Sequence, residues 1–173
     1  ILLNHFTADI ENELKHVDPN VQITMASTDR PDKYISDYDA EKLILALHAC
    51  PHGVIGMSHD IEGLVETSTN LASVKMGDDS TIIVGTSQRS SIESCKNMIA
   101  NQVASVFKLA GAQVTHGDGY PGWAPNPDSK ILKVAQETYK RLFNKDAKIM
   151  AIHAGLECGL LSGKKPELDC VSF

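Results

Sequence analysis

Three residue types that carry chemistry in enzymes stand close together near the C-terminal end of the sequence. The stretch AIHAGLECGL, residues 151–160, holds His153, Glu157 and Cys158 together with two glycines. His153 and Glu157 are four positions apart, the offset that places two side chains on one face of a helix. The stretch therefore admits two kinds of site: a metal pair, or a Cys158 nucleophile with His153 as its base.

Neither kind of site is specified by this spacing alone. A catalytic zinc takes three protein ligands, and a His-x-x-x-Glu pair supplies two. The simplest alternative is a turn whose small residues allow close packing. The position of the stretch favours a loop that contacts a ligand, because it follows the apolar segment 147–152 and ligands in α/β domains bind beyond the carboxyl ends of strands.

Other polar and aromatic residues are weaker candidates. Arg89 stands at the end of a predicted strand, where it is either a solvated surface residue or a fork of donors for a carboxylate. Asn70 is expected to be a polar residue on a strand face, and His59 and His116 are expected to be solvated. Trp123 is expected to anchor a boundary loop by packing, with ligand stacking as the alternative.

The elements that must position these residues follow from the apolar pattern and the turn signals. Strands are predicted at 21–28, at 63–76 and 80–88 as a hairpin, and at 112–118; helices are predicted at 1–16, at 39–49 and from a Ser90–Glu93 capping box to Gly111. The order β-α-β-β-α-β predicts an α+β fold with two layers, an antiparallel sheet with helices on one face.

A Gly- and Pro-rich stretch, residues 117–129, then marks a domain boundary or a crossing loop. Beyond it we expect a helix from Asp128 or Ser129 and strands at 147–152 and 167–173, a pattern typical of part of an α/β domain. The residues expected to face a core are Leu43, Ile44 and Leu47 in one helix, Ile92, Ile99, Val103, Val106, Phe107 and Ala110 in the next, and Ile131, Leu132, Ala135, Tyr139, Leu142 and Phe143 in the last.

Composition excludes several classes of protein. The 173 residues are 42% hydrophobic and 22% charged, so the chain can bury a core. The net charge of −6 with no basic run argues against a nucleic-acid or anionic-membrane partner, and no apolar run is long enough to span a bilayer. Four separated cysteines without a CxxC pair indicate buried free thiols in a reducing cytoplasm. The chain begins in a helical pattern without Met and ends in a strand pattern, so we expect a segment of a longer protein.

Several blocks in order resemble the bacterial Xaa-His dipeptidases, the aminoacyl-histidine dipeptidases (peptidase D, carnosinase-like) of the M20 metallopeptidase family. These blocks are PHGVIGMSHDIEGLVETSTNLASV, KLAGAQVTHGDGYPGWAPNPDS, ETYKRLFNK and IHAGLECGLL…PELDCVSF, and they cover nearly the whole chain from about residue 43. The resemblance implies a cytoplasmic enzyme that hydrolyses dipeptides with a C-terminal His, with two zinc ions in an α/β catalytic domain and an inserted lid domain that often forms a homodimer.

The resemblance also implies a division of the chain. Residues 1–117 would form most of the lid and residues 118–173 the start of the second catalytic-domain segment. The family's zinc ligands and its general-base glutamate lie in segments that this chain lacks, so no catalytic or metal residue is expected here and the chain alone is expected to be inactive. The residues expected to bind substrate are Arg89, Glu157, Gly155, His153 and Asn70. The alternative is a non-enzymatic dimerisation or binding module of the lid type.

Overall fold

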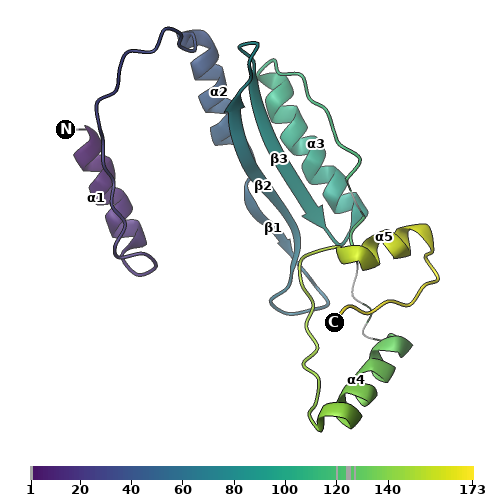
Figure 1. The fold of residues 1–173 in the computed structure, drawn as a ribbon. Coiled ribbons are helices and arrows are strands. Elements are labelled where there is room, and N and C mark those ends of the chain that lie inside the picture. The colour runs from purple at the N-terminus through teal and green to yellow at the C-terminus, as the bar shows by residue number, and fades with distance from the viewer. Residues whose placement is uncertain (1, 120, 124–125, 127) are drawn as a thin grey trace. The chain divides into compact units, whose positions relative to one another are not determined.

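The computed structural model describes residues 2–119, 121–123, 126 and 128–173, and part of the predicted boundary loop lies outside them. Figure 1 shows the elements in chain order. The described elements are the helices α1 (Leu2–Leu14), α2 (Asp37–Ala49), α3 (Glu93–Leu109), α4 (Lys130–Phe143) and α5 (Leu156–Lys164), and the strands β1 (Gly53–Met57), β2 (Val65–Met76) and β3 (Ile82–Ser90). The chain divides into two compact units, residues 1–36 with α1 and residues 37–173 with the other elements. The predicted domain boundary at 117/118 stays a prediction. Within the described residues, no helix is long and apolar enough to cross a membrane.

The second unit contains a three-stranded antiparallel sheet in the order β1-β2-β3. The predicted hairpin is confirmed as β2 and β3, which are joined across Gly77–Ser80, where the Gly77 N–H donates to the Thr81 carbonyl at 2.8 Å. β1, which the sequence pattern did not predict, pairs with the beginning of β2. The predicted α+β class with an antiparallel sheet is therefore confirmed, although the third strand is β1.

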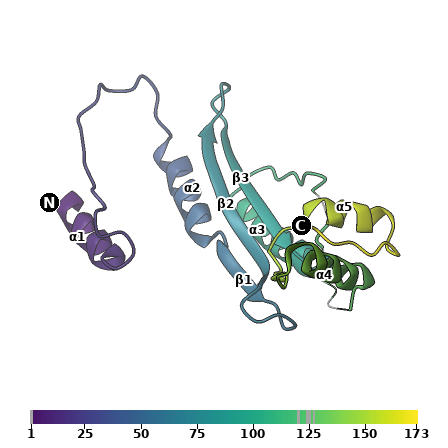
Figure 2. The same cartoon turned by 60° about the horizontal axis from the view of Figure 1, so that its bottom comes forward.

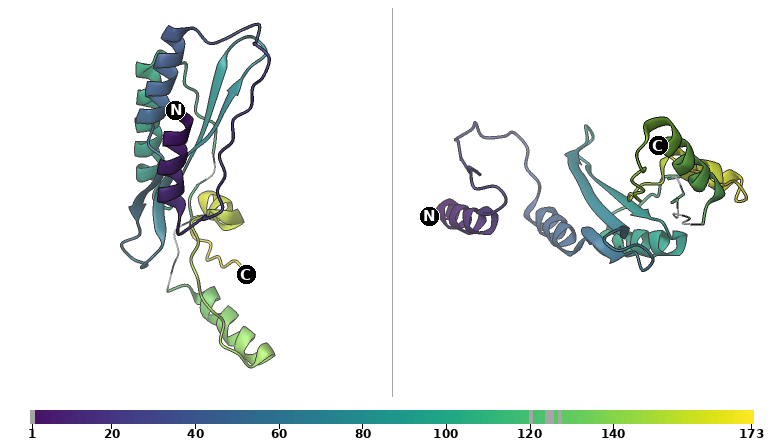
Figure 3. Two further views of the ribbon diagram at one scale, coloured as in Figure 1. Left: turned by 90° about the vertical axis from the view of Figure 1, so that its left-hand side faces the viewer. Right: turned by 90° about the horizontal axis from the view of Figure 1, so that it is seen from below.

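The hydrophobic core lies on one face of this sheet. Ala46 and Cys50 at the end of α2 pack with Val103 and Phe107 of α3, and partly buried sheet residues close the cluster. Figure 2 shows α3 behind the hairpin, and the left view of Figure 3 shows α2 and α3 on the same side of the strands. The apolar stripe predicted for α3 is confirmed in Ile99, Val103 and Phe107, which are all buried. The stripe predicted for α2 is wrong at Ile44, whose side chain faces solvent, while Ala46 and the predicted Leu47 pack at the core.

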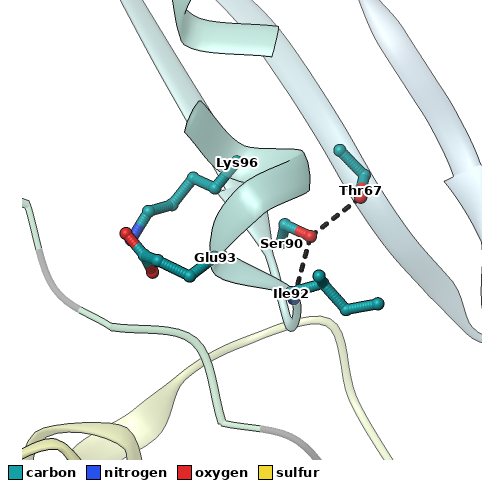
Figure 4. A network of polar contacts seen from close by, with 5 residues as sticks. All are labelled: Thr67, Ser90, Ile92, Glu93 and Lys96. Atoms are coloured by element: carbon teal, nitrogen blue, oxygen red, sulfur yellow. Dashed lines mark hydrogen bonds and ion pairs between the residues drawn. The ribbon is translucent and has the colours of Figure 1, made fainter. Parts of the chain in front are cut away.

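The two ends of α3 are built differently from each other. The predicted capping box is wrong: the N-cap residue is Ile92 and no side chain caps it, because Ser90 is the last residue of β3 and its hydroxyl hydrogen-bonds to Thr67 at 2.8 Å (Figure 4). Ser90 Oγ accepts from the Ile92 N–H, and Glu93 pairs with Lys96 at 2.8 Å.

The predicted end of α3 at Gly111 is confirmed. Its φ of 86° lets the N–H groups of residues 111 and 112 donate to the last carbonyls of the helix.

Four predicted strands are absent: 21–28, 112–118, 147–152 and 167–173 have no strand structure. A strand persists only where a neighbouring strand satisfies its backbone groups, and none of the described strands pairs with these segments. Ile149, Met150 and Ile152 are each more than half exposed as a result.

The predicted helix at 129–143 is confirmed with Ser129 as its N-cap, but its apolar stripe is uncovered, since no residue of α4 is buried. Burial of these apolar side chains requires surface that the described residues do not supply.

The segment that leaves the α3 layer passes close to the end of β3. A Cβ atom on Gly122 would collide with the carbonyl oxygen of Ser90 and lie 2.9 Å from the Cα of Ser91. On the other side of the crossing, a Cβ atom on Gly159 of α5 would lie 2.7 Å from the carbonyl oxygen of Pro121. Backbone therefore touches backbone at two points where the chain crosses from the sheet to α5.

We predict that Gly122→Ala destabilises the second unit by about 1–3 kcal/mol, because the added methyl group must push two backbone segments apart. Urea unfolding followed by circular dichroism measures the effect. Gly117→Ala is the matched control, since a Cβ atom there has nothing within 4 Å. Equal unfolding midpoints for the two variants would contradict the close crossing.

We predict that Ile99→Ala costs about 2–5 kcal/mol of unfolding free energy, because Ile99 is fully buried at 0% exposure. Ile44→Ala makes the same chemical change in α2 where the side chain is 64% exposed, and we expect it to change stability by less than about 0.5 kcal/mol. Thermal unfolding of both variants under one buffer checks the contrast, and a large loss for Ile44→Ala would restore the predicted α2 stripe.

Candidate functional site

The candidate site begins on the sheet face that the helices leave open. Side chains alternate along β2, and Thr67 and Thr69 point to the helix side, where they are buried. Ser68 and Asn70 therefore point to the open face. In the antiparallel register Ser68 lies opposite Arg89 of β3, so Arg89 is on the open face beside it.

A residue from the C-terminal part of the chain joins this face. The Nε2 atom of His153 lies 2.7 Å from the Oγ atom of Ser68, and the two groups share a hydrogen bond across 85 positions of sequence. The imidazole also hydrogen-bonds to the backbone of Val65, three residues earlier on the same strand. The fold thus brings together Ser68, Arg89 and His153, two of which were predicted as substrate residues.

The surroundings of His153 favour its neutral form. Partial burial is the main cause that lowers the pKa of its imidazole below 6.5, and the positive charge of Arg89 lowers it further. The hydrogen bond to the Val65 backbone acts in the opposite direction and is the smaller effect. At neutral pH the ring is therefore an uncharged hydrogen-bonding group next to a guanidinium.

Arg89 is exposed on the open face and forms no ion pair with any carboxylate of the described residues. Its planar guanidinium can donate two parallel hydrogen bonds to one carboxylate. A ligand with a carboxylate group would meet an available cation here, and a ligand with a cationic group would be repelled.

The remaining predicted residues occupy different positions around this site. A hollow runs along β3, between this strand, α3 and residues 112–119, and Arg89 is among its lining residues. Gly155, the N-cap of α5, lines this hollow together with Trp123 and His153. Glu157 is exposed in the first turn of α5, and Asn70 is exposed further along β2; neither side chain lines the hollow.

The helical pair that the spacing of His153 and Glu157 would allow does not form. His153 precedes α5, and the chain turns at Leu156 with a φ of 48°, so the two side chains do not share a helix face. Among the described residues there is no group of three or more His, Cys, Asp or Glu side chains that could hold a metal ion.

Burial and the raised pKa of Cys158 argue against the thiol alternative. Cys158 is a free thiol buried in α5, and burial, followed by the nearby Cys170 and Glu157, raises the pKa of its thiol. A raised pKa reduces the thiolate that a nucleophile needs. Cys158 is therefore a packing residue.

Ser68 is the residue of this cluster that the sequence did not single out. Its only signal was its place in the strand: residues 68 and 70 have the same parity, which puts Ser68 on the face of the candidate Asn70. The partner on the far segment could not be inferred, because local pattern does not determine contacts over 85 residues.

We predict that His153 titrates with a pKa below 6.5 in the folded chain and that Arg89→Gln raises this pKa, because it removes the second cause of the shift. NMR titration of the ring protons measures both values. The neutral form is favoured by folding, so the stability that it contributes is fully present above pH 6.5 and is lost as the pH falls through the lowered value. An Arg89→Gln pKa equal to that of the wild type would contradict the electrostatic contact.

Comparison with known proteins finds similar sequences and structures among dipeptidases. The chain is 37% identical over 172 residues to the cytosol non-specific dipeptidase of Escherichia coli (strain K12). The matched region covers 99% of this chain and 35% of that protein. The crystal structure of aminoacylhistidine dipeptidase from Vibrio alginolyticus superposes with a TM-score of 0.84 at 35% identity over 98% of this chain and 34% of that one. The chain thus spans about one third of the length of each. No family model matches it.

Proposed function

We propose that the chain is a segment of an aminoacyl-histidine dipeptidase, an enzyme that hydrolyses dipeptides with a C-terminal His such as carnosine. The proposal is supported by the similarity of the chain to about one third of two dipeptidases. Residues 1–117 would contribute most of the lid, and residues 118–173 the beginning of the second catalytic-domain segment. The observation that carries the proposal is Arg89, an exposed guanidinium without a carboxylate partner in the described residues, held beside the neutral ring of His153.

In this proposal Arg89 binds the C-terminal carboxylate of the dipeptide. The neutral His153 hydrogen-bonds to the peptide without competing with Arg89 for the anion, because an uncharged ring next to a guanidinium adds no second positive charge. The backbone at Gly155 holds the peptide chain, because a glycine has no Cβ atom and lets the ligand approach closely.

Glu157 and Asn70 take the outer positions. Glu157 would pair with the amino group or the imidazolium of the substrate, and Asn70 would hydrogen-bond to its backbone. Both are exposed in this chain, so their contacts would form only when the ligand and the rest of the enzyme are present.

The full-length enzyme would use two zinc ions, which polarise a carbonyl and lower the pKa of a bound water. The described residues of this chain do not fit a zinc centre, because they contain no suitable cluster of ligands. The ligands and the general base would come from the other two thirds of the enzyme. The chain by itself would therefore bind substrate weakly and hydrolyse none.

A cytoplasmic location and a homodimer formed through the lid complete the proposal. The word cytosol in the name of the E. coli relative supports the first. The second is supported by β1, which carries exposed Val54 and Met57 side chains and has a strand on one side only among the described residues.

The carboxylate clamp is tested in the full-length dipeptidase that contains this chain. We predict that Arg89→Ala lowers kcat/KM for carnosine by about 2–4 kcal/mol, a loss typical of removing one partner of a desolvated charge pair. Carnosine amide lacks the carboxylate, so the same substitution should change its kcat/KM little. Steady-state kinetics with both substrates measures the selectivity for the free acid, which Arg89→Ala should abolish.

Arg141→Ala is the matched control, since Arg141 is an exposed arginine of α4 in the same unit and does not line the hollow. It should leave the preference for carnosine over its amide intact. An Arg89→Ala enzyme that keeps the wild-type preference would return Arg89 to a solvated surface residue and remove the main support for the proposed site.

A further inference from the structure

Ser68 has a place in this site that goes beyond the residues proposed above to contact the dipeptide. We infer that Ser68 is a positioning residue, whose hydroxyl fixes the imidazole of His153 over the open sheet face so that the ring and the guanidinium of Arg89 meet one ligand together. This inference rests on the proposed function for the nature of the ligand, and on the Ser68–His153 contact for the role of the hydroxyl.

The sheet register determines where the Ser68 hydroxyl lies. On the helix side, Thr67 bonds to Ser90 at 2.8 Å and Thr69 accepts from Gln88 at 3.1 Å. These are cross-strand neighbours, so they lock β2 and β3 in one register, and a slip of one residue would turn Ser68 into the core. Ser68 is thus a hydroxyl on a rigid strand.

His153 has no comparable support from its own segment. It stands before α5 in a stretch without strand structure, and its neighbour Ile152 is exposed. The ring instead takes its orientation from β2, through the hydroxyl of Ser68 at 2.7 Å and the backbone of Val65. Both contacts come from one strand, so β2 determines where the ring lies.

A hydroxyl suits this position better than a charged group would. It can either donate to the ring nitrogen or accept from it, so it holds the neutral imidazole without adding charge. A carboxylate at residue 68 would pair with Arg89 and favour the protonated ring, which would occupy the group that the ligand needs. Arg89 is the charged side chain that acts on the ring in this structure.

The test compares Ser68→Ala with Ser68→Thr, which keeps the hydroxyl on a side chain that a strand accepts. In the chain itself, NMR of the His153 ring reports the tautomer and the pKa. Ser68→Ala should change the tautomer ratio and move the pKa toward 6.5, because a released ring loses its partial burial. Ser68→Thr should keep both close to the wild type. Ser87→Ala should leave the ring signals unchanged, since Ser87 lies on β3 opposite Asn70 and not opposite Ser68. Unchanged ring signals in Ser68→Ala would overturn the inference.

In the full-length dipeptidase, Ser68→Ala should reduce kcat for carnosine by up to about 100-fold, shift its pH profile with the His153 pKa, and be rescued by Ser68→Thr. Wild-type kinetics for Ser68→Ala together with a loss of selectivity for Arg89→Ala would overturn the role of Ser68 and leave the proposed function standing. The reverse result, a loss for Ser68→Ala with the wild-type selectivity in Arg89→Ala, would support the positioning role and overturn the carboxylate clamp.

Discussion

The hydrogen bond between Thr67 and Ser90 is the constraint on which the rest of the second unit depends. Both side chains are almost completely buried, at 2% and 5% exposure, so a change of register would leave polar atoms unsatisfied in the helix layer. This one bond ties the end of β3 to β2, places the start of α3 through the Ile92 N–H, and by alternation sends Ser68 and Arg89 to the other face. The register of β2 and β3 therefore determines which side chains face the core and which face the candidate site.

Local pattern was sufficient for elements that satisfy their own backbone groups or pair with a near neighbour. The hairpin, α3 with its glycine end, and α4 with its Ser129 cap were all predicted from sequence because turns and caps lie within a few residues of one another. The strands at 147–152 and 167–173 were wrong for the opposite reason: an apolar run becomes a strand only beside a partner, and the described residues contain none. The same dependence explains the uncovered apolar side of α4.

The candidate site divides in a similar way. Arg89 could be found from its position at a strand end, and His153 from its place after an apolar segment, although spacing suggested a helical pair with Glu157 that the turn at Leu156 prevents. Ser68 could not be found, because its importance depends on a contact with a residue 85 positions away. The pKa of His153 depends on the same tertiary contacts, since burial and the charge of Arg89 both arise from the meeting of distant segments.

The backbone contact at Gly122 has a consequence for how such a site can diverge. Where main chain touches main chain, exchange of side chains cannot adjust the spacing between the sheet and the segment that carries His153. Natural variation in ligand choice would then be confined to side chains that project from the open face and from the first turn of α5. The distance between the sheet and the segment of His153 would then stay almost constant among related proteins, while the side chains around the candidate site would vary.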